Sequence, residues 1–477
     1  TSCGFGFINS SQIKDITGGT SLGSAADGYL RAGVAVYNGA GRGSSGYSAI
    51  ALNDVIMLAL DVGAGKAWFG RNGTWDTGSP AAGTTPTVSF TPNGSYLIGA
   101  AGYESSAGTL NAGARPFAYT APSGFKALCT ANLPAPLVTK PSTVFDVALW
   151  TGTNGSNART ISGLGFSPDL VWIKVRSQAY NHQLFDAVRG ATRSLLSSST
   201  SAELVNDVAG TLGTFNSDGF TTSPVTNNTS FNNLNDAYAA WCWDAGTTTV
   251  TNTQGSISSQ VRANASAGFS IVSWTGNATN GATVGHGLGV KPHLVIYKNR
   301  TDAEPWPVLS DVLLGPTGYL YLNSTAAKSD AAQVAAPTST VLTLSSYNDA
   351  NGNGDAMIAY CFAPVVGYSS FGSYTGNGSS TDNTFVYTGM RPRFVLLKRS
   401  DSTGNWVVWD AVRNAYNVAN SILLPNTSAA EYSPDAKIDI LSNGFKIRDN
   451  SSDSGTNGAT YIYAAFAEAP FQYARAR

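Results

Sequence analysis

The chain has 477 residues, of which only 12% are charged, and its formal net charge is -1. At roughly 100 to 200 residues per domain, this length predicts three to five domains. A near-neutral chain has no basic surface for phosphate backbones, so no nucleic-acid partner is expected, and no apolar run approaches the roughly 18 residues that membrane insertion needs.

Residues 1–134 predict a β-sandwich, because short strands alternate with glycine-containing turns. The stretch NDVIMLALDVGAGKAWFGRNGTWDTG, which begins at Asn53, contains two strands around residues 63–66 and a turn at Asn72 and Gly73. The strand-like run SYLIGAAGY and the segment PSGFKALC follow it.

This region resembles the SPRY family, whose motif runs roughly as GDVIGVALD, a turn and KLWFYKNG, and ends before a P-x-G-F-x-x-L segment. The matching positions are 54–61, 66–73 and 122–128. The resemblance implies a SPRY-like (concanavalin-like) sandwich. Such a sandwich has strands ahead of the matched segment, so the one at 1–134 is expected to be N-terminally incomplete, with another segment or chain covering its open edge.

Residues 144–246, 268–366 and 368–472 are predicted to be three homologous β-rich domains, called repeats 1, 2 and 3. The repeated segments are WTGTNGSNARTISGLGFSPDLVWIK at Trp150, WTGNATNGATVGHGLGVKPHLVIYK at Trp274 and YTGNGSSTDNTFVYTGMRPRFVLLK at Tyr374. A proline and then a lysine follow the leading aromatic residue at identical distances in all three copies: Pro168, Pro292, Pro392, Lys174, Lys298 and Lys398. A unit of about 100 residues is long enough to bury its own core.

Each repeat also carries a second strand before an aspartate, at Asp186, Asp311 and Asp410, and only the aspartate of repeat 2 lies one position further from its leading aromatic residue. A closing aromatic strand surrounds Cys242, Cys361 or Ala465. Short β-branched and aromatic runs bounded by Gly, Asn, Ser and Pro predict an all-β fold. Residues 201–208 and 326–334 are the best helix candidates, and the polar segments 135–143 and 246–268 are predicted linkers.

The sequence predicts no catalytic residue, no metal site and no cofactor. The histidines His182, His286 and His293 have no histidine at the parallel positions of the other repeats, and neither HExxH nor CxxC spacing supports them. No GxSxG motif is present. The recurring aspartates are interpreted as structural, capping a turn or pairing with Arg189 or Arg413.

Four weaker patterns remain. In NDANGNGD, at 348–355, Asp349, Asn351 and Asn353 match the start of a calcium loop, but Tyr360 stands where the bidentate glutamate belongs, so a hairpin turn is favoured and calcium binding stays open. The glycine-rich segment 39–48 lacks the context of a phosphate-binding loop. Cysteines at 242 and 361 are expected to be reduced and buried. Exposed tryptophans would stack on sugars, with Trp75, Trp306 and Trp406 as candidates, although most tryptophans are expected in the core.

A SPRY-like sandwich ending in GFKALCTANLP, followed by repeats of the WTGNG, RPxFVLLK and WxVWDAVRN type, resembles a class of uncharacterised bacteriophage virion proteins. The resemblance spans nearly the whole chain and supplies no catalytic residues. It implies a non-enzymatic structural protein of the virion, assembled in the host cytoplasm with other virion proteins. We expect a tail fibre or appendage, homotrimeric, that attaches to a host-surface glycan.

Three alternatives remain open at this stage. A capsid decoration or head-fibre protein would use the same domains on the shell. A tail-spike glycan depolymerase would need a cleft with two carboxylates roughly 5 to 10 Å apart. A secreted bacterial adhesin would carry a signal peptide in its full gene.

Overall fold

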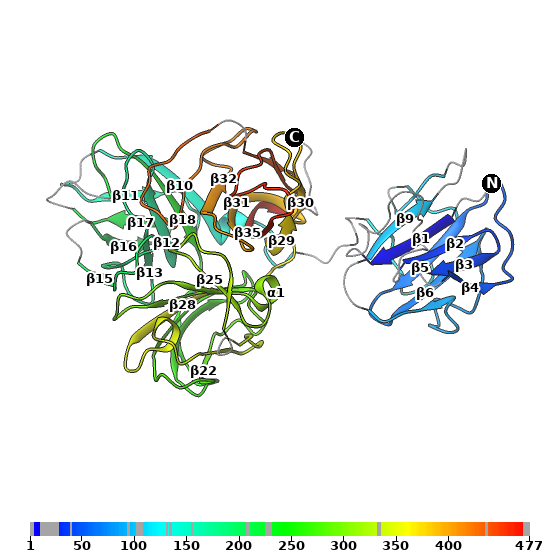
Figure 1. The fold of residues 1–477 in the computed structure, drawn as a ribbon, viewed down its shortest axis with the longest axis horizontal. Helices are drawn as coiled ribbons and strands as arrows, with labels where there is room; N and C mark the ends of the chain where they lie inside the picture. Colours follow the sequence, from blue (N-terminus) through cyan, green and yellow to red (C-terminus); the bar gives the residue numbers. More distant parts are fainter. Residues whose placement is uncertain are drawn as a thin grey trace. The chain divides into compact units, whose positions relative to one another are not determined.

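The computed structural model describes residues 4–9, 28–38, 41–92, 96–101, 108–113, 115–129, 132, 136–153, 156–206, 210–224, 231–331, 335–434 and 437–470. About 43% of the chain lies in strands and 3% in helices (Figure 1), which confirms the all-β prediction. The chain divides into two compact units, Thr1–Leu133 and Pro134–Arg477. The three repeats therefore belong to one unit.

The first unit is a two-sheet β-sandwich. One sheet has the order β4-β3-β2-β1-β9, with β1 at Gly4–Asn9, β2 at Gly28–Ala32, β3 at Ala35–Asn38, β4 at Gly41–Ser45 and β9 at Tyr96–Ala101. The other contains β5 (Ile56–Asp61), β6 (Lys66–Arg71), β7 (Thr74–Trp75) and β8 (Val88–Ser89). Phe7 and Tyr29 of the first sheet pack with Phe69 of the second. The covering of an open edge by another segment or chain stays a prediction.

In the second unit, each repeat has a large and a small antiparallel sheet. The strands of repeat 1 are β10 (Phe145–Thr151), β11 (Arg159–Ser162), β12 (Leu170–Val175), β13 (Gln183–Asp186), β14 (Arg193–Leu196), β15 (Leu204–Val205), β16 (Leu212–Asn216), β17 (Gly219–Thr222) and β18 (Ala237–Trp243), preceded by the 3-10 turn η4 (Pro141–Thr143). Its large sheet has the order β10-β18-β12-β13-β14-β15, and its small sheet the order β11-β17-β16.

Repeats 2 and 3 follow the same plan. The segment before repeat 2 contributes β19 (Thr249–Asn252) and β20 (Ser259–Asn264) to its large sheet. Repeat 2 itself contains β21 (Phe269–Thr275), β22 (Thr283–Gly285), β23 (Leu294–Asn299), β24 (Pro307–Leu309), α1 (Asp311–Leu314), β25 (Gly318–Tyr321), β26 (Ser329–Asp330), β27 (Val341–Thr343), α2 (Asn348–Asn351) and β28 (Ala356–Phe362). Repeat 3 contains β29 (Ser369–Thr375), β30 (Phe385–Tyr387), β31 (Met390–Arg399), β32 (Trp406–Asp410), β33 (Ile438–Leu441), β34 (Gly444–Ile447) and β35 (Thr460–Pro470).

Strand register is the same in the three repeats. The leading aromatic residue of the first strand pairs with the closing strand at Trp150 and Tyr238, Trp274 and Met357, and Tyr374 and Tyr461. The closing strand then pairs with the middle strand at Trp243 and Leu170, Phe362 and Leu294, and Phe466 and Phe394. Equal spacing in the sequence therefore corresponds to equal strand pairing.

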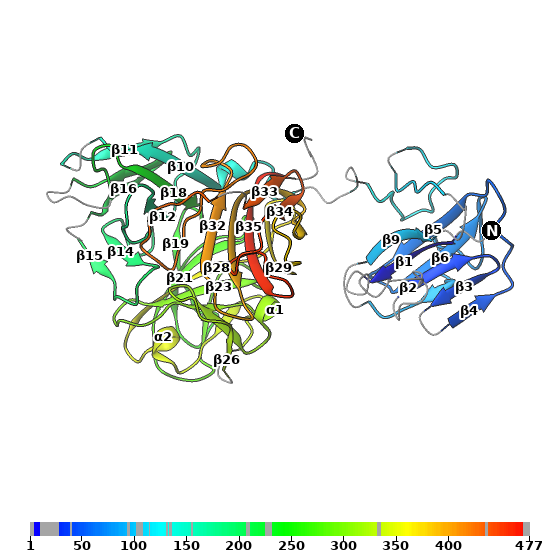
Figure 2. The ribbon, with the colours of Figure 1, turned by 45° about the horizontal axis from the view of Figure 1, so that its top comes forward.

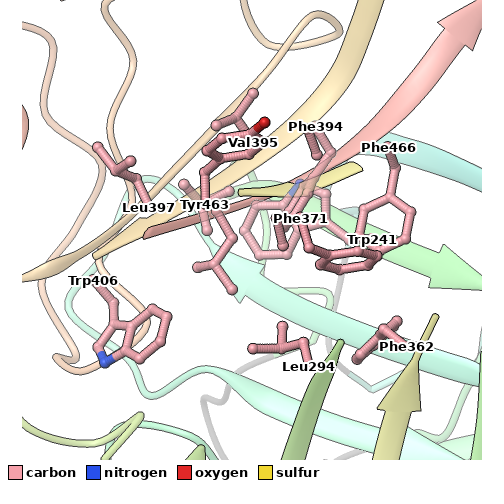
Figure 3. Close-up of a cluster of buried hydrophobic side chains, with 14 of the residues drawn as sticks. Trp241, Leu294, Phe362, Phe371, Phe394, Val395, Leu397, Trp406, Tyr463 and Phe466 are labelled. Atoms are coloured by element: carbon pink, nitrogen blue, oxygen red, sulfur yellow. The ribbon is translucent and has the colours of Figure 1, made fainter. Parts of the chain in front are cut away.

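The three large sheets share one core, and Figures 1 and 2 show the three repeats grouped together in the second unit. At its centre, the equivalent rings of Trp243, Phe362 and Phe466 contact one another, with centroids 5.6 to 6.1 Å apart. Figure 3 shows how side chains from all three repeats meet there. A purely apolar void of about 20 Å³ at this point leaves room for no more than one water molecule. The repeats thus form a closed ring around a shared apolar core.

Two predictions about local structure are wrong. The predicted linker 246–268 contains β19 and β20, which extend the large sheet of repeat 2 and bury Val261. The segment is rich in polar residues because it lies at the edge of the sheet, where only one face of the strands is covered. The described parts of the helix candidates, 201–206 and 326–331, contain the short strands β15 and β26, whereas the described helices are the single turns α1 and α2. Residues 207–208 and 332–334 of these candidates lie outside the described residues. Ser310 caps α1 by accepting a hydrogen bond from the Leu313 amide.

Candidate functional site

The recurring lysines link the repeats to one another. Their side chains are fully buried, and each donates to a backbone carbonyl of the adjacent repeat: Lys174 to Ser428 (3.2 Å), Lys298 to Thr200 (2.8 Å) and Lys398 to Thr325 (3.3 Å). Burial lowers the pKa of all three to about 8. A single lysine position therefore stabilises all three interfaces of the ring.

The aspartates of repeats 1 and 3 form buried ion pairs, as the sequence predicts. Asp410 Oδ1 accepts from the amides of residues 412 and 413, and its Oδ2 accepts from Arg413 Nε (2.5 Å). Asp186 makes the same contacts with Arg189. An aromatic residue of the neighbouring repeat completes each cluster, because Trp241 Nε1 donates to Asp410 (3.0 Å) and the Tyr360 hydroxyl donates to Asp186 (2.8 Å).

In repeat 2 the assignment of Asp311 to this position is wrong. Since Val295 pairs with Leu309, the residue opposite Leu294 is Ser310, and Asp311 lies one position beyond it. Asp311 begins α1 and forms an ion pair with Lys291. It lies one position further from the leading aromatic residue than Asp186 and Asp410 do, because the residue equivalent to them is Ser310. The arginine position is taken by Leu313 in this repeat.

Among the described residues, the interface between repeats 2 and 3 consequently lacks the carboxylate–arginine pairs found at the other two and keeps only its lysine, Lys398. Glu203 binds Arg300 across one interface and Glu431 binds Arg176 across the second, each with an accompanying backbone hydrogen bond of 2.8 to 2.9 Å. The equivalent backbone bond of the third interface runs from Lys328 to Ser400 (2.8 Å). The recurring charged residues are therefore structural.

Trp306 and Trp406 belong to the core, as expected for most of the tryptophans, and cannot stack on a ligand. Both are buried, and their indole N–H groups donate to backbone carbonyls of the adjacent repeat, Trp306 to Leu196 (3.0 Å) and Trp406 to Tyr321 (2.9 Å). His182 lies eight residues after its lysine, as these tryptophans do, and is fully buried. Burial lowers the pKa of His182 well below its usual value, so it is neutral at pH 7.

Cys242 and Cys361 are also buried, each in the core between the two sheets of its own repeat, as predicted. Burial raises the pKa of Cys361 to about 12 and that of Cys242 well above its usual value. Cys129 is a free, partly exposed thiol, while Cys3 lies outside the described residues. Neither buried cysteine is available for chemistry in the folded protein.

A cavity of about 530 Å³ in repeat 2 was not predicted, and we call it the tyrosine cavity. It lies between the strands β23 to β25 and the segment 343–350. Its lining is Tyr297, Glu304, Pro305, Pro307, Leu309, Tyr319, Tyr321, Thr343, Leu344, Ser345, Ser346, Tyr347, Asn348, Asp349 and Ala350. Four of these residues are tyrosines, and Tyr347 is 45% exposed. The cavity therefore combines aromatic faces with many polar groups.

Strand alternation positions two of the tyrosines. In β25 the side chains of Tyr319 and Tyr321 lie on the cavity face, while Leu320 between them belongs to the shared core. Their rings are 5.3 Å apart in an edge-on arrangement. One strand thus contributes to the ring core on one face and to the cavity on the other.

Two carboxylates face the cavity, Glu304 and Asp349. Burial, with Glu304 nearby, raises the pKa of Asp349 to about 6, although the Tyr321 hydroxyl, 3.2 Å away, donates a hydrogen bond to it and acts in the opposite direction. At the spacing from the lysine that places Glu304 in repeat 2, the other repeats have Tyr180 and Gly404. This carboxylate is therefore specific to repeat 2.

The calcium-loop pattern at 348–355 does not correspond to converging ligands. Asp349 accepts from Tyr321, Asn351 contacts Asn277, and Asp355 accepts from Asn299. The segment begins with α2, so the expected hairpin turn is wrong as well. Within the described ranges, no group of three or more His, Cys, Asp or Glu side chains is placed to hold a metal ion.

Among the residues that the structure describes, no helix is long and apolar enough to cross a membrane. A family model described as a domain of unknown function (DUF7483) matches residues 140–470, which is most of the chain and includes all three repeats. No curated protein and no solved structure matches.

Proposed function

Because the chain belongs to the DUF7483 family, whose description assigns no activity, we propose its function from the chemistry of the tyrosine cavity. The protein is a structural component of a bacteriophage particle, a tail fibre or appendage that binds host-surface glycans without cleaving them. The single observation that carries the binding role is the grouping of four tyrosines with polar side chains around one cavity.

The cavity has the properties of a saccharide site. Its volume of about 530 Å³ is within the usual range for small-ligand pockets. The C–H faces of a sugar ring pack on aromatic rings, and tyrosine also offers a hydroxyl. Glu304 and Asp349 supply acceptors for sugar hydroxyls, and Asn348 and Ser345 supply both donors and acceptors.

The ring of repeats supports the structural part of the proposal. Shared packing and buried links hold the repeats in one rigid unit, on which a ligand site keeps its geometry. Resemblance to phage virion proteins supports the location, with other virion proteins as partners. A homotrimer of chains would present three copies of the cavity and raise avidity for a repetitive glycan. A capsid decoration or head-fibre protein is the alternative location, and labelled electron micrographs of purified particles distinguish the two.

Glycan-array binding of the whole chain tests the proposal. Tyr347→Ala truncates an aromatic side chain at the cavity, while Tyr416→Ala truncates an 88% exposed tyrosine in repeat 3 and serves as the matched control. We expect Tyr347→Ala to weaken saccharide binding about fivefold or more and Tyr416→Ala to leave it unchanged. Absence of binding by the parent chain, or equal loss in both variants, contradicts the proposal.

A second candidate function is glycan hydrolysis. Glu304 and Asp349 line one cavity, and the pKa of Asp349, raised to about 6, suits a general acid. Release of reducing ends from host-surface polysaccharide, abolished by Asp349→Asn, would establish hydrolysis and overturn the non-enzymatic proposal. Binding without release of reducing ends supports attachment.

A further inference from the structure

We infer that the tyrosine cavity accepts uncharged saccharides and rejects saccharides that carry carboxylate, sulfate or phosphate groups. The inference rests on the proposed glycan binding and adds the chemical class of the ligand. Its basis is the set of charged groups that line the cavity, which are all acidic.

Among the described residues that line the cavity, Glu304 and Asp349 are the only charged ones, and none is a lysine or arginine. Acidic saccharides are usually held by arginine or lysine, whose N–H groups match a carboxylate or phosphate. An anionic sugar in this cavity would meet two like charges and no lysine or arginine in the lining to pair with, and the partly buried setting weakens solvent screening.

Lys298, whose charge acts on both Glu304 and Asp349, is already held by contacts within the ring. Lys298 is fully buried, and its ammonium donates to the backbone carbonyls of Thr200 (2.8 Å) and Glu304 (2.6 Å). It lies on the strand next to Tyr297, whose side chain lines the cavity, so alternation directs the two side chains to opposite faces of β23. The ammonium is therefore not available to an incoming anion.

Uncharged saccharides, in contrast, donate hydrogen bonds to the same carboxylates. Sugar hydroxyls are donors, and an ionised carboxylate accepts several hydrogen bonds, which are stronger than those between neutral groups. The tyrosine rings cover the apolar face of a pyranose without any charge requirement. The features that repel an acidic sugar thus favour a neutral one.

Calorimetry at pH 7.5 on the full chain tests the inference with matched pairs of oligosaccharides. The pairs are oligomers of glucose and glucuronate, of galactose and galacturonate, and of N-acetylglucosamine without and with 6-sulfate. We expect the neutral member of any pair that binds to bind at least tenfold more tightly. Glu304→Gln should reduce this ratio at least threefold, whereas Asp382→Asn, which removes an exposed charge in repeat 3, should not change it.

The outcomes separate the two proposals. If an acidic member binds as tightly as its neutral counterpart or more tightly, the inference is wrong while glycan binding stands. An unchanged ratio in Glu304→Gln also overturns the inference, because the selectivity then has another source. If neither these pairs nor the glycan array shows binding, the proposed function itself fails.

Discussion

Replacing Asp410 by serine removes one carboxylate of a fully buried ion pair and leaves Arg413 with Glu431 as its remaining acidic partner. Repeat 2 shows an alternative solution at the same position of the ring, because Ser310 and Leu313 stand where repeat 3 has Asp410 and Arg413. We therefore expect Asp410→Ser alone to be strongly destabilising and Asp410→Ser/Arg413→Leu to recover most of the loss.

The magnitude follows from the contacts. Removing one member of a buried pair costs about 3 to 5 kcal/mol, whereas replacing both members by uncharged residues is often close to neutral. In the double variant, the Trp241 N–H loses its carboxylate acceptor, which costs about 1 to 2 kcal/mol. At about 2.1 cal/mol/K per residue, the unit at 134–477 should lose about 4 to 7 °C in Tm with the single variant and about 1 to 3 °C with the double variant.

Tryptophan fluorescence during heating measures this unit selectively, because eight of the ten tryptophans belong to it. Burial alone would raise the pKa of Asp410, but Arg413 and its other partners hold that pKa below the usual value. The stabilisation is therefore present above about pH 4 and is lost as the pH falls further, so the assay is run at pH 7. Ser310→Ala, which removes only a helix cap, is the control. A single-variant shift no larger than that of Ser310→Ala, or a double variant less stable than the single one, would refute the reasoning.

Three further predictions concern other parts of the chain. Native protein should react quickly with a thiol reagent at Cys129 and only after unfolding at Cys242 and Cys361, as mass spectrometry of the labelled peptides can establish. Asp349→Asn should raise unfolding stability by about 1 to 3 kcal/mol at pH 7.5, because the folded-state pKa of about 6 exceeds the unfolded value and ionisation costs stability as pH rises through this range; the gain should vanish at pH 4. Light scattering at micromolar concentration should give the mass of a homotrimer, and a stable monomer would exclude it.

The repeat was visible in the sequence because proline and lysine keep their distance from the leading aromatic residue, and strand register depends on such distances. Closure of the repeats into a ring was not visible. The residues that meet at the centre, Trp243, Phe362 and Phe466, have the same pattern whether they fill a core within one domain or a core shared by three. Hydrophobic periodicity shows that a face is buried without indicating what covers it.

The role of the lysines was missed for a related reason. A lysine at the end of a strand is usually solvated, and only the tertiary structure brings a neighbouring carbonyl to within 2.8 Å of Lys298. The sequence did contain one indication of this role. A charged residue that recurs at the same position of every repeat is expected to serve the structure that the repeats share. Asp186 and Asp410 were interpreted correctly on that ground.

The tyrosine cavity escaped prediction because its residues come from distant segments and do not recur. Tyr319 and Tyr321 alternate along one strand, while Tyr347 and Asp349 follow further along the chain, beyond β27. In the sequence, Asp349 belongs to a calcium-loop pattern and shows no relation to the tyrosines. The positions at which the repeats differ contain one indication of the cavity: Glu304 has no acidic counterpart in either of the other repeats.

In a ring of similar repeats, the positions that differ among the repeats indicate where a ligand site is expected. Positions that serve ring closure, such as Lys298, are held to the same residue type by the same contacts in every repeat. A position that is not needed for ring closure can change in one repeat with little loss of stability, because the other two interfaces retain their buried aspartate–arginine pairs. Repeat 2 has both the interface at Ser310, where the aspartate–arginine pair is missing, and the cavity with Glu304 and Asp349. The repeat that departs furthest from the shared pattern is therefore the one in which a ligand site is expected.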